Sequence, residues 1–169
     1  TGQIVNHGSE DWDNLVNLGK DEDGNIVIMN KEIYESDLAV MIGHTLGNPY
    51  GGYSGGYKHT ATGIVHWKTI ATNHVPHVMH GDDFTPVSSD SVMRKKFNSI
   101  GMHMEKCMGR KFFTVDAVLD THQRQIAVFA GYAKEMQPLS WEVADKRTYV
   151  PWAEKKYDVM VFGMPQFFH

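Results

Sequence analysis

Leu38-Ala39-Val40-Met41-Ile42-Gly43 is a continuous apolar run that leads directly into a stretch rich in glycine and histidine. A short apolar run bounded in this way is typical of a strand that is buried in a parallel sheet. In open α/β sheets, ligands bind beyond the carboxyl ends of such strands. The run therefore predicts an α/β fold with the functional site just after Gly43.

The residue distribution supports this position for the site. Six of the ten histidines and half of the sixteen glycines lie between Gly43 and Gly81. This segment is therefore expected to hold the residues that bind or react.

Patterns on both sides of this segment predict the other elements of the fold. Ser88-Ser89-Asp90 offers an N-cap for a helix whose apolar face is Met93, Phe97, Ile100 and Met104. The remaining expectations are a short helix at Trp12–Leu18, strands at Asn25–Asn30 and Tyr157–Gly163, a hairpin over Phe113–Tyr132, a helix at Lys134–Tyr149 and a core position for Trp67. Together they predict an α/β fold: a mostly parallel sheet with covering helices, plus a β-hairpin and the first strand of a second domain.

Composition excludes several classes of protein. The 169 residues are 41% hydrophobic, and a formal net charge of −4 argues against general binding to nucleic acid or to an anionic membrane. The single cysteine, Cys107, favours a reducing compartment, and we expect a cytoplasmic protein. The sequence holds no apolar run of 18 residues, and we expect no signal peptide, because the first residues lack a basic region followed by an apolar stretch.

A glycine loop ends in a lysine at Gly51-Gly-Tyr-Ser-Gly-Gly-Tyr-Lys58. Glycines let backbone N–H groups approach an anion, and a lysine adds a full positive charge, so a phosphate or carboxylate would suit the loop. The spacing is neither that of a Walker loop nor that of the dinucleotide fingerprint. The alternative is a tight surface turn with a solvated lysine.

Three histidines follow at intervals of three residues, at His74, His77 and His80. Residues three apart on a helix are neighbours, and imidazoles bind Zn, Cu, Fe or Ni. Pro76 interrupts the helical pattern, so His80 need not share a face with His74. A zinc site and ordinary surface histidines both remain open.

The order of these motifs resembles the nickel-dependent lactate racemase family. The similarity runs through Val5-Asn-His7, Glu35-Ser-Asp37-Leu-Ala-Val, the glycine loop with Lys58, Asn73-His74 and the later hairpin. Its specific part is the Gly-Tyr-Ser-Gly-Gly-x-Lys motif together with the step of sixteen residues from Lys58 to His74.

The resemblance implies a nickel-pincer nucleotide, tethered to Lys58, with His74 as the protein's ligand to nickel. It also implies racemisation or epimerisation of a small 2-hydroxy acid by hydride transfer to the cofactor and back, and cofactor-maturation enzymes as partners. We expect Tyr53, Ser54, Gly55 and Gly56 to contact the cofactor, with the loop tyrosines either stacking on its ring or packing inside the protein.

One catalytic position departs from the family pattern. Ten residues before the lysine the family has an acid–base histidine, but this chain has Asn48, whose amide takes no proton at neutral pH. His44 and His59 are the candidates from the same loop to replace it. A homologue that binds a carboxylate or phosphate without turnover is the alternative function.

The resemblance also suggests how the chain is divided. Residues 1–132 would be the C-terminal part of an N-terminal, cofactor-tethering domain, and 133–156 an interdomain helical connection. Residues 157–169 would begin a truncated C-terminal domain, so we expect a fragment of a longer protein.

Overall fold

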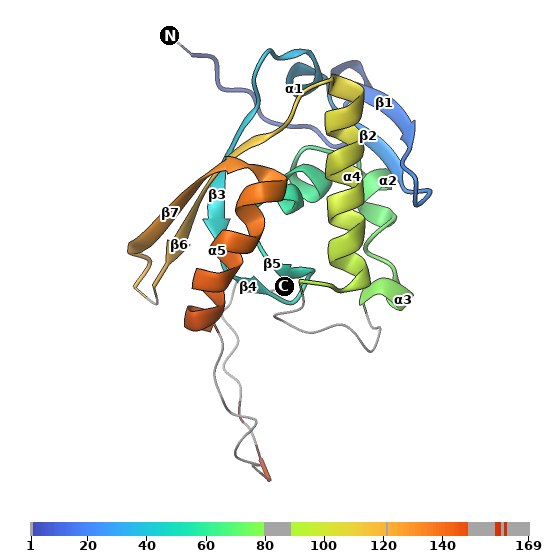
Figure 1. Ribbon diagram of the computed structural model, residues 1–169. Helices are drawn as coiled ribbons and strands as arrows, with labels where there is room; N and C mark the ends of the chain where they lie inside the picture. The colour runs from blue at the N-terminus through green and yellow to red at the C-terminus, as the bar shows by residue number, and fades with distance from the viewer. Residues whose placement is uncertain (1, 80–88, 121, 149–157, 160, 162–169) are drawn as a thin grey trace.

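A computed structural model describes residues 2–79, 89–120, 122–148, 158, 159 and 161 (Figure 1). The first half holds a 3-10 turn η1 (Trp12–Asn14), strands β1 (Leu15–Lys20) and β2 (Ile26–Asn30), helix α1 (Lys31–Glu35), strands β3 (Val40–Thr45), β4 (Gly47–Asn48) and β5 (Gly52–Tyr53), and a π-helical turn η2 (His59–Gly63). It continues with α2 (Trp67–Ala71), α3 (Pro76–Met79), α4 (Val92–Met108), β6 (Phe113–Leu119), β7 (Gln125–Tyr132) and α5 (Ala133–Thr148).

The main sheet has the order β3-β6-β7. β3 is parallel to β6, and β6 is antiparallel to β7, as the predicted hairpin requires. The fold is α/β, but the expectation of a mostly parallel sheet is wrong, because the described strands contain one parallel pair. The reason is that β1–β2, β4–β5 and β6–β7 are each joined by a short connection, and short connections produce antiparallel pairs.

Strand β3 is buried on one side only. Ile42 is 78% exposed and Val40 is also exposed, whereas Thr45 on the opposite face is buried. The apolar run was expected to form a buried strand of a parallel pair; the parallel pairing is confirmed, but one face of the strand is exposed. Helix α5 packs against the sheet from one side (Figure 1), which accounts for the alternation.

Helix α4 supplies the centre of the core. Met93, Phe97, Ile100 and Met104 are fully buried along one face, as their spacing predicts. The N-cap is Ser91 rather than Ser88-Ser89-Asp90, and its side chain accepts a hydrogen bond from the N–H of Arg94. Gly109 ends the helix in the left-handed conformation with φ 66°.

Two expectations near the N-terminus and the site are wrong. The segment from Trp12 to Leu18 forms a 3-10 turn and then β1, because β1 pairs with β2 across the turn that Asp21 and Gly24 close. Trp67, expected in the core, is 47% exposed at the start of α2.

The predicted helix after the hairpin is present as α5, although Pro138 lies in its second turn rather than its first. The predicted strand over Tyr157–Gly163 lies outside the described residues except for Asp158, Val159 and Val161. Among the residues that the structure describes, no helix is long and apolar enough to cross a membrane.

Candidate functional site

The glycine loop lies beyond the carboxyl end of β3, with α4 at its side (Figure 1). Arg94, which is fully buried, donates from Nε to the carbonyl oxygen of Gly51 at 2.7 Å and from Nη2 to that of Tyr53. Its guanidinium group also lies over the rings of Phe97 and Trp141, with Cζ 5.4 and 5.1 Å from their centroids. One buried cation thus fixes two carbonyls of the loop.

Three backbone N–H groups of the loop donate to acceptors within the protein. Gly56 N donates to Asp116 Oδ2 at 2.8 Å, and Tyr57 N donates to Gln137 Oε1 at 2.9 Å. Ser54 N donates to Leu46 O. Because these N–H groups form hydrogen bonds that hold the loop, they are not available to a ligand. Lys58 is the charged side chain that the loop offers to one.

Two glycines of the loop are required by close packing. A Cβ on Gly55 would lie 2.5 Å from Asp116 Oδ2, and a Cβ on Gly56 would lie 2.3 Å from Gln137 Oε1. Both residues have positive φ, at 79° and 54°. Gly55 and Gly56 therefore let the loop approach β6 and α5 closely.

The side chains of Tyr53, Ser54 and Tyr57 are also used for packing and internal bonds. Tyr53 stacks on Trp141 with ring centroids 5.3 Å apart, and its hydroxyl donates to Asp145. Tyr57 is buried, and its hydroxyl donates to Glu105 at 2.9 Å. Ser54 Oγ donates to His44 O and accepts from Leu46 N. Of the tyrosines considered as a stacking surface, Tyr53 and Tyr57 thus pack inside the protein.

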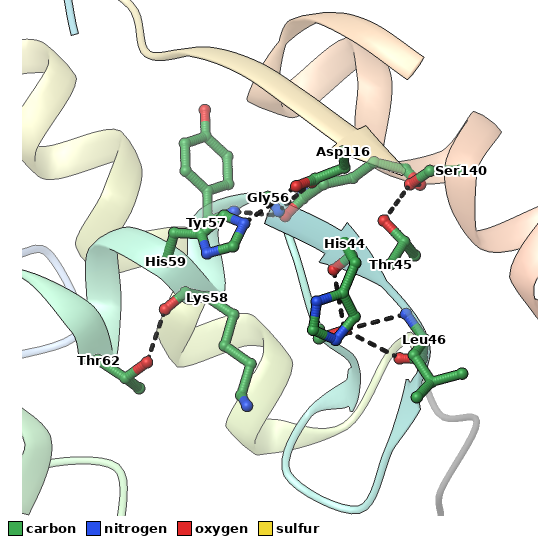
Figure 2. A network of polar contacts seen from close by, with 12 residues as sticks. His44, Thr45, Leu46, Gly56, Tyr57, Lys58, His59, Thr62, Asp116 and Ser140 are labelled. Carbon is green, nitrogen blue, oxygen red and sulfur yellow. Dashed lines mark hydrogen bonds and ion pairs between the residues drawn. The ribbon is translucent and has the colours of Figure 1, made fainter. Parts of the chain in front are cut away.

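Lys58 follows the loop as the N-cap of η2 and is half-buried. Its amine has no hydrogen bond or ion pair with any described residue, and Figure 2 shows the side chain extending away from the polar network around it. Burial lowers the pKa of the Lys58 amine, and the positive charge of Arg94 lowers it further. A larger fraction of this amine is therefore unprotonated and nucleophilic than for an exposed lysine.

His74 presents one ring nitrogen for coordination. Its Nδ1 lies 2.5 Å from Asn73 Oδ1 and 3.3 Å from Ile70 O, both acceptors, so Nδ1 carries the proton and Nε2 has a free lone pair. Burial lowers the pKa of His74, the bond to Ile70 opposes this, and the charge of Lys58 lowers it again. The charge of Lys58 acts on His74, so the two side chains lie near each other.

The predicted histidine cluster is only partly described. His77 is exposed on α3, and His80 lies outside the described residues. Within the described ranges, no group of three or more His, Cys, Asp or Glu side chains is arranged to hold a metal ion.

The three candidates for the acid–base group lie in different environments. Asn48 Oδ1 accepts from Tyr50 N at 2.8 Å and stabilises the turn between β4 and β5. His44 is exposed at the end of β3. His59 Nε2 lies 3.0 Å from Oδ1 of the buried Asp116 (Figure 2).

Sequence reasoning missed Arg94, Asp116 and Gln137, which shape the loop from α4, β6 and α5. Asp116 alternates with apolar residues in β6, as Thr114 does and as a solvent-facing residue would, and nothing in the sequence distinguishes Arg94 from an ordinary helix surface residue.

A sequence model of the family described as lactate racemase N-terminal domain matches residues 1–85. The chain belongs to this family. The lactate racemase of Lactiplantibacillus plantarum is 28% identical over 151 residues, which are 88% of this chain and 34% of that protein. The chain thus spans about a third of the length of this lactate racemase.

Solved structures have the same fold. The lactate racemase apoprotein from Thermoanaerobacterium thermosaccharolyticum superposes with a TM-score of 0.74 at 23% identity, over 86% of this chain and 34% of that one. A Thermotoga maritima protein gives 0.69 at 21% identity, over 84% of this chain and 38% of that one. At these identities the superpositions establish the fold of the chain. They do not establish its chemistry.

Proposed function

We propose that this chain is the cofactor-tethering part of a nickel-pincer-nucleotide-dependent racemase or epimerase of a small 2-hydroxy acid. The observation that carries the proposal is that the Lys58 amine, which has no partner among the described residues, acts electrostatically on the preoriented imidazole of His74. Membership in the lactate racemase N-terminal domain family supports it.

The residues fit such a cofactor in their chemistry. A covalent tether needs an unprotonated amine, and burial together with Arg94 favours that form of Lys58. Nickel accepts an imidazole nitrogen as a ligand, and the bond from His74 Nδ1 to Asn73 Oδ1 keeps Nε2 available. The Tyr50 ring lies beside His74, with the two ring centroids 5.8 Å apart.

Each side chain then has a defined task. The Lys58 amine would hold the cofactor by a covalent tether, and His74 Nε2 would be the protein's ligand to nickel. When bound, the cofactor supplies the acceptor for the hydride on C2 of the 2-hydroxy acid. Arg94, Asp116 and Gln137 keep the loop in the shape that presents Lys58.

The test is to mature the protein with the cofactor-biosynthesis enzymes and to measure peptide masses and bound nickel. We expect a mass adduct on the Lys58 peptide and stoichiometric nickel. Lys58→Arg should abolish the adduct, and His74→Ala should lower nickel occupancy while leaving Lys58 modified. Lys31→Arg, at an exposed lysine on α1, is the matched control and should change neither.

Two results separate the alternatives. A free Lys58 and no nickel in the matured wild-type protein would overturn the proposal. An adduct with nickel but no interconversion of D- and L-lactate or of other 2-hydroxy acids would favour a homologue that binds without turnover, and restoring histidine by Asn48→His would then be expected to produce activity.

A further inference from the structure

His59 and Asp116 form a close pair on the face of the sheet that the loop covers. His59 Nε2 lies 3.0 Å from Asp116 Oδ1, the His59 side chain is 26% exposed, and the Asp116 side chain is fully buried. The second carboxylate oxygen, Oδ2, accepts from Gly56 N at 2.8 Å. The carboxylate is therefore fixed from two sides (Figure 2), and the imidazole that it orients is partly exposed.

Glycines in the surrounding backbone leave room for the His59 and Asp116 side chains. Gly43 is the β3 residue opposite Asp116, and a Cβ there would lie 2.3 Å from His59 Cε1. A Cβ on Gly55 would lie 2.5 Å from Asp116 Oδ2. Two positions without side chains, on β3 and in the loop, thus leave the space that the imidazole and the carboxylate occupy.

The pair has the arrangement of an acid–base dyad. With Nε2–H directed to the carboxylate, His59 Nδ1 carries the lone pair, and it has no hydrogen-bond partner in the part of the chain that the structure describes. A buried carboxylate fixes the tautomer of its histidine and stabilises the imidazolium that forms on proton uptake. His59 is also the residue next to Lys58, the proposed tether.

The other two candidates lack these features. Asn48 takes no proton, and its Oδ1 already accepts from Tyr50 N. The His44 ring has no hydrogen-bond partner among the described residues, so nothing there fixes its orientation or stabilises its charge.

We propose that His59, oriented by Asp116, is the group that takes the hydroxyl proton of the 2-hydroxy acid and returns it. The proposal rests on the proposed function. It assigns to His59 the acid–base role that Asn48 cannot perform. Asp116 is a positioning residue, because it acts through His59.

The step balances in protons and electrons. The O–H bond breaks, the proton moves to His59 Nδ1, and the electron pair forms the C=O bond as C2 gives its hydride to the acceptor that the cofactor supplies. In the reverse direction His59 returns the proton to the oxygen while the hydride returns to C2. The net change is inversion at C2 or none, with no external oxidant or reductant.

The main test uses the protein matured with its cofactor. We expect His59→Gln to lower kcat for lactate racemisation about 10²- to 10⁴-fold, the usual worth of a positioned acid–base group, with KM changed less than about 3-fold. Asp116→Asn keeps an oxygen acceptor for Gly56 N but removes the carboxylate beside His59, and should lower kcat at least about 10-fold. His122→Gln, in the exposed hairpin turn, is the matched control and should leave kcat unchanged.

Two measurements separate chemistry from folding and from cofactor loading. Added imidazole should restore part of kcat in His59→Gly, which a purely structural role would not allow. In the protein without cofactor, millimolar D- or L-lactate should slow the modification of His59, but not of His122, by diethyl pyrocarbonate, read by peptide mass.

The outcomes distinguish this inference from the proposed function. A wild-type protein without adduct or nickel overturns the proposed function. Normal adduct and nickel with undiminished kcat in His59→Gln overturns the role of His59, and a large loss in His44→Gln in the same series would assign that role to His44.

Discussion

Arg94 Nε donates a hydrogen bond to the carbonyl oxygen of Gly51 over 2.7 Å, from a guanidinium group that is fully buried. No carboxylate pairs with this cation among the described residues, and its Nη1 has no hydrogen-bond partner there. Burial lowers the pKa of Arg94 to about 9, so the side chain is still charged at neutral pH. The loop is thus built around a positive charge that has no ion-pair partner among the described residues and that acts on Lys58.

The first prediction concerns the reactivity of Lys58. Arg94→Met removes the charge and should raise the pKa of the Lys58 amine, so that acetylation at pH 8 falls about 3- to 10-fold relative to that of Lys31. Competitive labelling with acetic anhydride and peptide mass spectrometry measures this ratio. Arg94→Lys retains the charge and should lose less reactivity, and equal labelling in wild type and in a folded Arg94→Met would contradict the prediction.

The second prediction concerns the space beside His59. Gly43→Ala places a Cβ against the imidazole and should destabilise the protein by about 1–3 kcal/mol, the usual cost of overpacking. Gly63→Ala is the control, because a Cβ there meets nothing within 4 Å, and it should change stability by less than about 0.5 kcal/mol. Urea unfolding measures the free energy of unfolding of both variants. An equal loss in the two would contradict the prediction and would mean that His59 moves aside freely.

The third prediction concerns the core under the loop. Phe97 is fully buried on α4, contacts Arg94 and would lie 2.7 Å from a Cβ on Gly51, so Phe97→Ala should cost about 3–5 kcal/mol. Met102 on the same helix is 40% exposed, and Met102→Ala should cost less than about 1 kcal/mol. Thermal and urea unfolding measure the loss of stability in each variant. A similar loss in both would contradict the prediction.

The fourth prediction is a pH dependence of stability that comes from His66. This nearly fully buried residue is the N-cap of α2, and its Nδ1 accepts a hydrogen bond from Lys68 N, which requires an unprotonated nitrogen. Burial and then the charge of Lys68 lower the pKa of His66 below its usual 6.5. Below pH 6.5 the unfolded chain therefore binds more protons than the folded one, and stability falls as pH falls.

The slope contributed by His66 should reach at most about 1.4 kcal/mol per pH unit. His66→Asn keeps a side-chain acceptor for the N-cap but cannot titrate, so its free energy of unfolding should depend less on pH between 7.5 and 5 than that of the wild type. Parallel pH profiles for the two proteins would contradict the assignment.

Local patterns predicted the elements whose causes are local. The three- and four-residue spacing of Met93, Phe97, Ile100 and Met104 predicted the buried face of α4, and the alternation over Phe113–Leu119 predicted β6 and its hairpin. The same reasoning failed for Leu38–Gly43, because burial of a second sheet face depends on what packs there rather than on the run itself.

For the candidate site, too, the sequence predicted only part of what the structure shows. The motif spacing predicted Lys58 and His74 as site residues, and that assignment remains a prediction. The residues that shape their surroundings come from 20 or more positions away in the chain: Arg94 from α4, Asp116 from β6 and Gln137 from α5. Their roles depend on tertiary contacts, so no local sequence pattern contains them.

The π-helical turn η2 over His59–Gly63 has a consequence for chain length. A π-turn closes its hydrogen bonds over one residue more than an α-turn, and such turns occur mostly as single-turn insertions in helices. The turn lies within the step of sixteen residues from Lys58 to His74. Deleting a single residue within 60–63 would leave too few residues for the π-turn and should shift His74 relative to Lys58. The number of residues between Lys58 and His74 therefore matters to the proposed site as well as their identity.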